Sequence, residues 1–193
     1  CGVYGYPLEQ AMRIAVREAR LVDSVRTDPR ANALFLDLLT SRNDPETVLR
    51  WLNETGVFGR FVPDFGRVNA QMQFDMYHHY TVDEHTIRAI GLMARIEKGE
   101  MKADHPLASE IIHKVVNRRA LYAAILLHDI AKGRRGDHSE LGAEVALKLC
   151  PRLGLSEEET ALVSWLVRTH LLMSATAFKR DLADFKTITA SHQ

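Results

Sequence analysis

Apolar residues recur at helical spacing through most of this 193-residue chain, and this repeat most limits the fold it can adopt. Between Pro7 and about Val22, for example, the apolar residues share one face of a predicted helix. The alternation of β-branched and polar residues that indicates strands is missing, and so are internal repeats. The pattern therefore predicts an all-α fold.

Pairs of residues that favour helix starts and stops divide the chain. Asp28-Pro29 and Asp44-Pro45 each combine a capping carboxylate with a proline suited to the first turn, and Gly56 ends the second of these helices. An irregular, aromatic-rich stretch over 57–80 follows. We therefore expect an N-terminal helical extension over 1–56 and a helical-bundle domain over 57–193. Because the chain opens and ends without clear boundary signals, we expect a fragment of a longer protein.

Capping boxes mark two further helix starts. In Thr81–Glu84 and Ser156–Glu159, a hydroxyl and a carboxylate can satisfy the free backbone N–H groups of a first turn. The sequence predicts helices from Thr81 to about Gly99, over 117–132, over 139–149, and from the second capping box to about His170.

The charge balance excludes some classes of partner. Lys plus Arg and Asp plus Glu each number 25, so no net field favours nucleic acid or an anionic membrane. No apolar run approaches the roughly 18 residues that span a bilayer, and charges interrupt the first twenty residues, unlike a signal peptide. Cys1 and Cys150 do not form a disulfide framework. A reducing, cytoplasmic setting is the simplest expectation.

The pair His128-Asp129 lies at the end of an apolar run, where burying a charge is costly unless a cation compensates it. A neutral imidazole and a carboxylate both bind divalent metals. His85, His138 and His170 also fall on or beside predicted helices. A lone histidine of this kind is more often a core residue, but facing helices of a bundle can converge such ligands on a metal. We expect four other histidines to be exposed to solvent: His78, His79, His105 and His113.

Two aspartates downstream of His170 are candidates for a last carboxylate ligand. Asp181 lies where a ligand could return to the site, although a surface ion pair is the simpler interpretation. Asp184 is the alternative, with a helix cap as its competing role. The sequence does not choose between them.

The order of His85, His128-Asp129 and a distal Asp resembles the HD superfamily of metal-dependent phosphohydrolases. The segments 56–66, 77–86 and 168–174 are further similar to the HD domain of the bacterial bifunctional uridylyltransferase/uridylyl-removing enzymes. This resemblance covers roughly residues 30 to 189. It implies an HD-domain helical bundle and a hydrolase that cleaves the phosphodiester linking UMP to a tyrosine of the PII nitrogen-regulatory protein.

The resemblance also implies partners and limits. Uridylylated PII would be the protein substrate, and glutamine would be sensed by parent domains. Neither the nucleotidyltransferase motif nor the glutamine-binding domains of that family are recognisable in this sequence. We therefore expect the uridylyl-removing activity alone, with no nucleic-acid or membrane partner.

Phosphodiester hydrolysis suits a two-metal site. We assign His85, His128, Asp129 and Asp181 to a first metal. His138 and His170 would hold a second, with Asp129 as the bridge. Mixed nitrogen and oxygen ligands fit Mn²⁺, Fe²⁺ or Zn²⁺ better than Mg²⁺ alone, and the resemblance favours Mn²⁺.

Three cationic residues follow the His-Asp pair. His128, Asp129 and Lys132 are the predicted catalytic residues, with Lys132 contacting a phosphate oxygen. Complementing a helix dipole is an equally weighted role for Lys132. Arg134 and Arg135 could hold the phosphate or an acidic surface of PII, or could lie in a solvated loop.

Two other functions remain open. An HD phosphohydrolase could act on a small nucleotide, in which case a narrower pocket is expected than for a protein conjugate. A non-catalytic regulatory HD module would be expected to lack ligands, yet every predicted ligand position carries a competent residue.

Overall fold

The computed structural model describes residues 24–68 and 81–172, and within these ranges the secondary structure is helical, without a β-strand. The α-helices are α3 (Pro29–Leu39), α4 (Pro45–Glu54), α5 (Val57–Phe61), α6 (Pro63–Val68), α7 (Val82–Glu97), α8 (Pro106–Ile111), α9 (Arg118–Leu127), α10 (His138–Arg152) and α11 (Glu157–Thr169). The all-α prediction is confirmed. The helix predicted over 7–22 lies outside the described residues.

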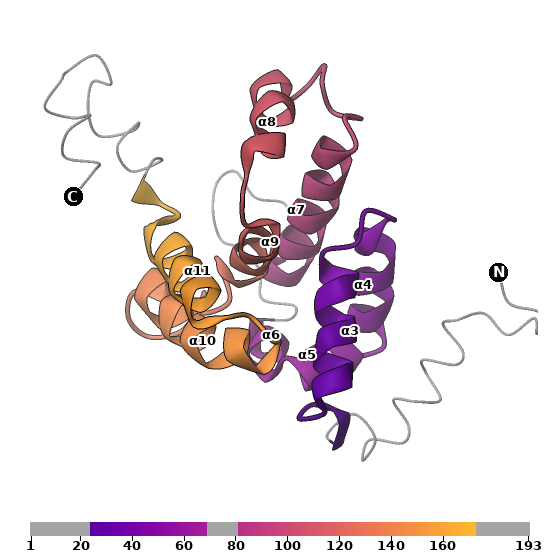
Figure 1. Cartoon of the computed structure of the whole chain (residues 1–193). Helices are drawn as coiled ribbons and strands as arrows, with labels where there is room; N and C mark the ends of the chain where they lie inside the picture. The colour runs from indigo at the N-terminus through magenta and orange to yellow at the C-terminus, as the bar shows by residue number, and fades with distance from the viewer. Residues whose placement is uncertain (1–23, 69–80, 173–193) are drawn as a thin grey trace, which may run out of the picture.

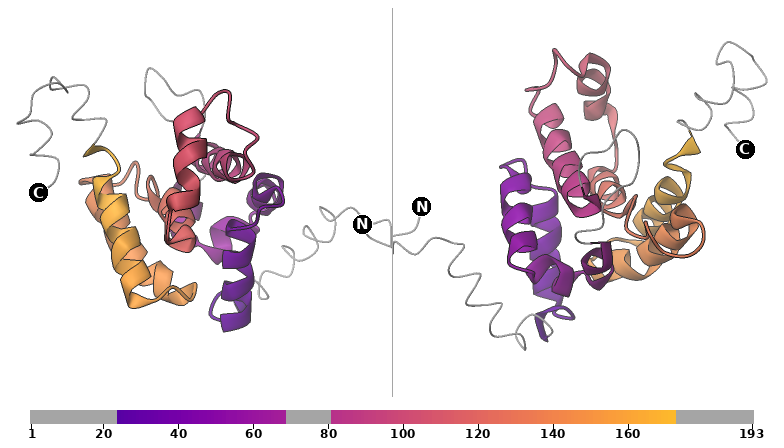
Figure 2. Two further views of the ribbon diagram at one scale, coloured as in Figure 1. Left: turned by 45° about the horizontal axis from the view of Figure 1, so that its top comes forward. Right: turned by 180° about the vertical axis from the view of Figure 1, so that it is seen from behind.

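Helix α9 lies at the centre of the molecule, between α7 and the α10–α11 pair (Figure 1). The two further views in Figure 2 show the same order. Helices α10 and α11 pack against each other and both contact α9, while α4 packs along α7. This arrangement brings the ends of several helices together around the chain that leaves α9. None of the described helices is long and apolar enough to cross a membrane.

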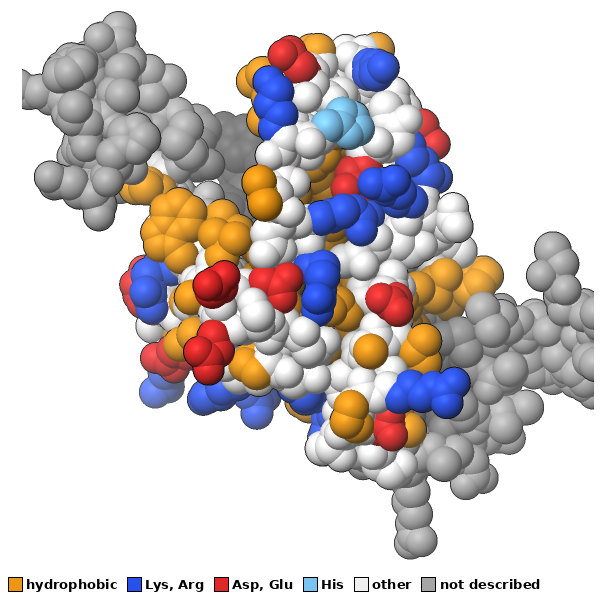
Figure 3. All heavy atoms as spheres, viewed as in Figure 1, with side chains coloured by type: hydrophobic (Ala, Val, Ile, Leu, Met, Phe, Trp, Pro, Cys, Tyr) orange, Lys and Arg blue, Asp and Glu red, His pale blue; other side chains and the backbone are white. Residues whose placement is uncertain are grey.

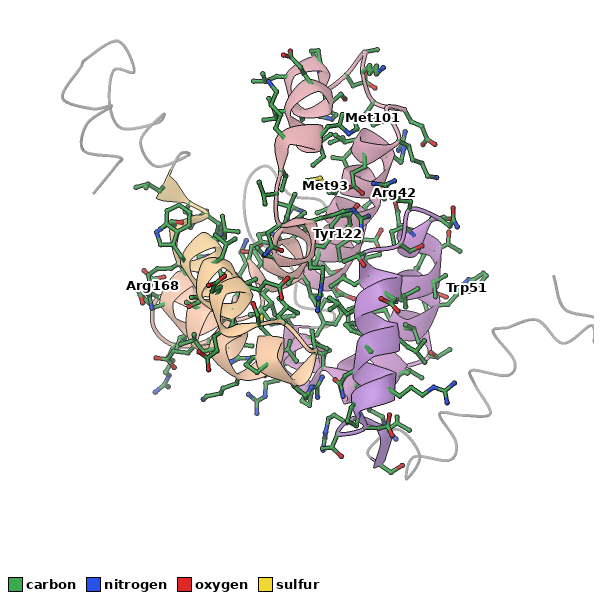
Figure 4. The ribbon with its side chains drawn as sticks, in the orientation of Figure 1. Arg42, Trp51, Met93, Met101, Tyr122 and Arg168 are labelled. Carbon is green, nitrogen blue, oxygen red and sulfur yellow. The ribbon has the colours of Figure 1, made fainter. Side chains whose placement is uncertain are left out.

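One large hydrophobic core joins these helices. It extends from Phe35 in α3 to Val167 in α11, and Leu126 and Leu127 of α9 are buried within it. Tyr122 of α9, labelled in Figure 4, is fully buried, and its hydroxyl donates a hydrogen bond of 2.9 Å to Glu97 at the end of α7. The apolar face of α9 therefore fixes its position, and with it the position of the residues that follow.

The stretch predicted to be irregular forms two short helices, so that expectation is wrong for residues 57–68. Phe58 and Phe65 are fully buried and stack with ring centroids 3.9 Å apart. Gly59 and Gly66 allow this approach, because a Cβ on Gly59 would lie 2.8 Å from the Gly66 Cα. Tertiary packing stabilises helices that are too short to form by themselves.

The helix ends agree with the sequence at some sites and not at others. Asp28 and Asp44 cap α3 and α4 as predicted, and Ser156 and Glu159 form the predicted capping box of α11. Thr81, however, makes no capping hydrogen bond with its side chain, so the predicted box at the start of α7 is wrong.

One helix boundary and one whole helix also differ from the prediction. Helix α9 ends at Leu127 rather than near Lys132, which places His128 at its C-cap and Asp129 in the turn that follows. Helix α8 was not predicted, because its six residues are too few to establish a period.

Candidate metal centre

Four histidines and Asp129 meet where helices begin and end. His85 lies in the first turn of α7, and His138 is the first residue of α10. His128 and His170 occupy the C-caps of α9 and α11. Residues separated by up to 85 positions are thus brought to one place by the packing of α7, α10 and α11 around α9.

These residues form two groups that could each hold a metal ion, and they share Asp129. We call His85, His128 and Asp129 the His85 triad, and Asp129, His138 and His170 the His138 triad. Within each triad, one ligand atom from every residue lies within 4.8 Å of the others. The sequence-predicted site residues in the described ranges therefore come together.

The two oxygens of Asp129 face different triads. Its Oδ2 lies 3.5 Å from His128 Nε2, and His128 Nε2 lies 3.2 Å from His85 Nε2. Its Oδ1 lies 3.7 Å from His138 Nε2 and 3.8 Å from His170 Nε2. A carboxylate placed in this way offers one oxygen to each of two metal positions.

Free backbone carbonyls at two helix ends orient two of the imidazoles. The His128 Nδ1 lies 2.8 Å from the Ile125 carbonyl oxygen, and the His170 Nδ1 lies 2.7 Å from that of Val167. The last carbonyls of a helix lack intrahelical partners and so accept these N–H groups. In the neutral ring, the lone pair is then on Nε2, which faces Asp129 in both cases.

The electrostatics of the site favour the metal-binding forms of His128 and Asp129. Burial lowers the pKa of His128, which keeps the ring neutral. Burial alone would raise the pKa of Asp129, but the neighbouring His128 side chain and the ammonium of Lys132 outweigh it, and the net shift of the pKa is downward. Asp129 is only 5% exposed. Metal ligands must be neutral imidazoles and ionised carboxylates, so both shifts favour coordination.

An unsatisfied nitrogen provides a test of whether a metal fits. His170 Nε2 is buried and has no hydrogen-bond partner among the described residues. Buried polar atoms are rarely left unpaired, and each exception calls for a missing water, ion or ligand. A divalent metal in the His138 triad would satisfy this lone pair, and the mixed nitrogen and oxygen donors suit a transition metal.

Lys132 lies beside the shared carboxylate. Its Nζ is 3.2 Å from Asp129 Oδ2, within the turns that follow α9 rather than in a helix. Arg134 instead donates to Asp64 at 2.7 Å, which ties the loop to α6.

The other residues singled out in the sequence lie away from the triads or outside the described residues. Asp181 and Asp184, the alternatives for a last ligand, lie outside the described residues, and so do His78 and His79. His105 and His113 are exposed, as predicted.

Contacts from α4, which the sequence did not predict, hold the two residues that precede His85. Asn53 donates a hydrogen bond of 2.7 Å to buried Asp83, and Arg50 forms an ion pair with Glu84. Polar residues at three- and four-residue spacing on α4 were the available signal, since such residues share a helix face. These contacts fix the first turn of α7, and hence His85.

A recess opens at each triad. The recess at His85 has a volume of about 390 Å³, and Glu46, Arg88, Ala89, Leu92 and Arg95 form the rest of its lining. The recess at His138 has a volume of about 430 Å³, and its lining includes Arg168, labelled on α11 in Figure 4, and the exposed Leu171 and Leu172. Exposed hydrophobic side chains also gather over α11 on the face shown in Figure 3.

Comparison with known proteins gives two matched families and several close relatives. The chain matches the HD domain over residues 82–190 and the Uridylyltransferase GlnD third domain over residues 8–61. It is 82% identical over 180 residues to a bifunctional uridylyltransferase/uridylyl-removing enzyme of Novosphingobium aromaticivorans, covering 93% of this chain and 20% of that protein. Proteins of the same name are 70% identical in Erythrobacter litoralis, with the same coverage, and 65% identical in Azospirillum brasilense, with 92% and 19% covered.

The chain thus spans about a fifth of the length of the curated relatives it matches. The HD match covers more than half of the chain and contains both triads. Because the matched segment contains the adjacent His and Asp and the histidines gathered around them, sequence and geometry agree: the chain belongs to the HD domain family.

Proposed function

We propose that this chain is a metal-dependent phosphodiesterase that removes UMP from the uridylylated tyrosine of a PII protein. The observation that carries the proposal is the single carboxylate of Asp129, shared by two histidine-containing triads. Two metals held close together favour the displacement of one oxygen by another at phosphorus. The names of the relatives support the choice of a uridylyl group over other phosphodiesters.

The ligand assignment follows the two triads. His85, His128 and Asp129 would hold one metal, with Asp181 as the predicted last ligand, and His138 and His170 would hold the second with Asp129. Mn²⁺ is the proposed metal. When bound, the metals would lower the pKa of a water and neutralise charge on the phosphoryl oxygens.

The side chains themselves supply orientation and charge. The carbonyls that accept from His128 and His170 hold both rings with Nε2 toward the centre, so little reorganisation is needed on binding. Lys132 can donate to a phosphoryl oxygen from its place beside Asp129. In the reaction, a water oxygen bonds to phosphorus and the bond from phosphorus to the tyrosyl oxygen breaks. The water gives up a proton as it bonds, and the leaving tyrosyl oxygen takes one up, so the products are UMP and a free tyrosine side chain.

The test is incubation of the purified chain with Mn²⁺ and uridylylated PII, with UMP measured by chromatography. We expect UMP release. We expect His138→Ala to reduce its rate more than about 100-fold, because losing a metal ligand should cost more than losing a group that hydrogen-bonds to a ligand, which costs about 10- to 100-fold. His113→Ala is the matched control, since His113 is exposed and lies in neither triad.

Other outcomes would favour other functions. Hydrolysis of free nucleotides without release of UMP from PII would indicate an HD phosphohydrolase for small substrates. Binding of PII without hydrolysis of either substrate would indicate a non-catalytic module.

A further inference from the structure

We propose that the recess at His85 binds the nucleoside part of the substrate, through Arg88, Arg95 and the apolar floor between them. The proposal rests on the proposed function only for the identity of the nucleotide. Its basis is a stripe of residues along α7 that leads away from the metal centre.

The stripe has a regular order. His85, Arg88, Leu92 and Arg95 follow one another at spacings of three or four residues, which places them on one face of α7. At a rise of about 1.5 Å per residue, Arg88 lies about 4.5 Å and Arg95 about 15 Å along the helix axis from His85. A phosphate held at the metal centre would therefore leave its attached nucleoside lying along this stripe.

The opposite wall comes from α4. The carboxylate of Glu46 reaches the recess because Gly91 of α7 has no side chain: a Cβ there would lie 2.1 Å from Glu46 Oε2. Arg50 holds this carboxylate by a contact of 2.8 Å. The recess thus combines two guanidinium groups, one fixed carboxylate and the apolar side chains of Ala89 and Leu92.

The charges in the recess are balanced, which distinguishes it from a docking site for an acidic protein. Arg88 Nε lies 3.7 Å from Glu84, and Arg95 Nε lies 3.9 Å from Glu100, while Glu46 lines the recess itself. A neutral group rich in donors and acceptors fits such a lining better than an anion does. Uracil and ribose are such groups, and guanidinium planes both stack on bases and donate to base carbonyls.

The recess at His138 lacks this combination. Among the described residues that line it, Arg168 is the single arginine, and its guanidinium donates to Glu140 at 2.9 Å, while Asp137 caps α10. Leu171 and Leu172 add apolar surface there, and they are 45% and 41% exposed. With the nucleoside at His85, the tyrosine and its protein would lie toward the His138 recess.

The test measures ligand binding as well as catalysis. UMP and ribose 5-phosphate, which lacks the base, are titrated into the Mn²⁺-loaded chain by calorimetry. We expect the chain to bind UMP at least about tenfold more tightly than ribose 5-phosphate, since a hydrogen bond to a charged group increases affinity by about a factor of ten or more. The double variant Arg88→Gln/Arg95→Gln should lose this preference and bind UMP about tenfold more weakly.

Arg119→Gln is a closely matched control. Arg119 is 47% exposed against 46% for Arg88, and its Nε lies 3.8 Å from Glu159, but it lies outside the recess. It should leave UMP affinity unchanged. Circular dichroism checks that all variants are folded.

Four results would overturn the proposal. The first is no binding of UMP by the wild-type chain, and the second is wild-type UMP affinity in the double variant. The third is an equal loss for UMP and ribose 5-phosphate, which would place the arginines on the phosphate alone. The fourth is a raised KM of the double variant for uridylylated PII without any loss of the preference for UMP over ribose 5-phosphate, which would indicate an acidic protein surface as the ligand. Because binding of UMP is read directly, failure of the PII reaction would leave this proposal separately testable.

Discussion

At the scale of single residues, Asp129 is a buried carboxylate that is surrounded by candidate metal ligands. It is 5% exposed, yet its pKa is lowered, because His128 and Lys132 together outweigh the cost of burying the carboxylate. Its two oxygens face separate groups of imidazoles. A carboxylate that faces two groups of imidazoles in this way can offer one oxygen to each of two metals, which is the bridging role that we propose for Asp129.

A bridging role for Asp129 predicts a difference between two substitutions. Asp129→Asn removes the charge and leaves a single acceptor oxygen, so both metal positions should weaken and bound Mn²⁺ should fall well below about one per chain. His138→Ala removes a ligand from the His138 triad only and should leave about one. Metal analysis of desalted protein measures both, with about two expected for the wild-type chain. Equal metal content in the two variants would contradict a bridging role.

At the scale of elements, the capping residues show what a local pattern can and cannot predict. Ser156 and Glu159 form the predicted capping box, since Glu159 reaches back to the Ser156 backbone at 2.8 Å. The same pattern at Thr81 fails because Glu84 is engaged by Arg50 from α4. A contact between residues 34 positions apart decides the outcome, and no local pattern contains it.

The two sites should therefore respond differently to the same kind of substitution. Ser156→Ala removes a capping hydrogen bond and should lower the free energy of unfolding by about 1 kcal/mol. For a chain of this size, that corresponds to a Tm lower by about 2–4 °C. Thr81→Ala removes no side-chain cap and should have a smaller effect. Thermal unfolding followed by circular dichroism measures both changes, and an equal loss at Thr81 would contradict this account.

The candidate metal centre was more predictable than the recess beside it. The candidate ligands could be selected from the sequence because imidazole and carboxylate groups are chemically distinctive and lie at or beside predicted helix ends. Arg88, Arg95 and Glu46 have no such distinction, since arginines and glutamates cover most helices. Only the packing of α4 on α7 shows that they surround one recess that includes His85.

At the scale of the whole molecule, the hydrophobic core crosses the boundary proposed between residues 56 and 57. Phe35 and Leu39 of α3 and Leu49 of α4 belong to the same buried cluster as Leu127 of α9. Helix α4 also holds the two residues that precede His85, through Arg50 and Asn53. The N-terminal extension therefore contributes to the core and to the geometry of the site, although the expected domain begins only at residue 57.

Removing residues 1–56 should consequently disrupt the rest of the chain. Burial of a Leu or Phe side chain contributes about 1.5–3 kcal/mol, so losing Phe35, Leu36, Leu39 and Leu49 approaches the 5–15 kcal/mol stability of a whole domain. We expect the 57–193 fragment to lose cooperative thermal unfolding and to bind Mn²⁺ weakly, because α7 no longer has α4 to pack against.

Point substitutions within α3 separate this effect from truncation itself. Leu39→Ala should lower the free energy of unfolding by about 2–5 kcal/mol, because Leu39 is fully buried. Leu34→Ala, in the same helix but 59% exposed, should change it by less than about 0.5 kcal/mol. A 57–193 fragment that unfolds cooperatively at the Tm of the full chain would instead show that the extension is dispensable. The first turn of α7 would then hold His85 in place without Arg50 and Asn53 of α4.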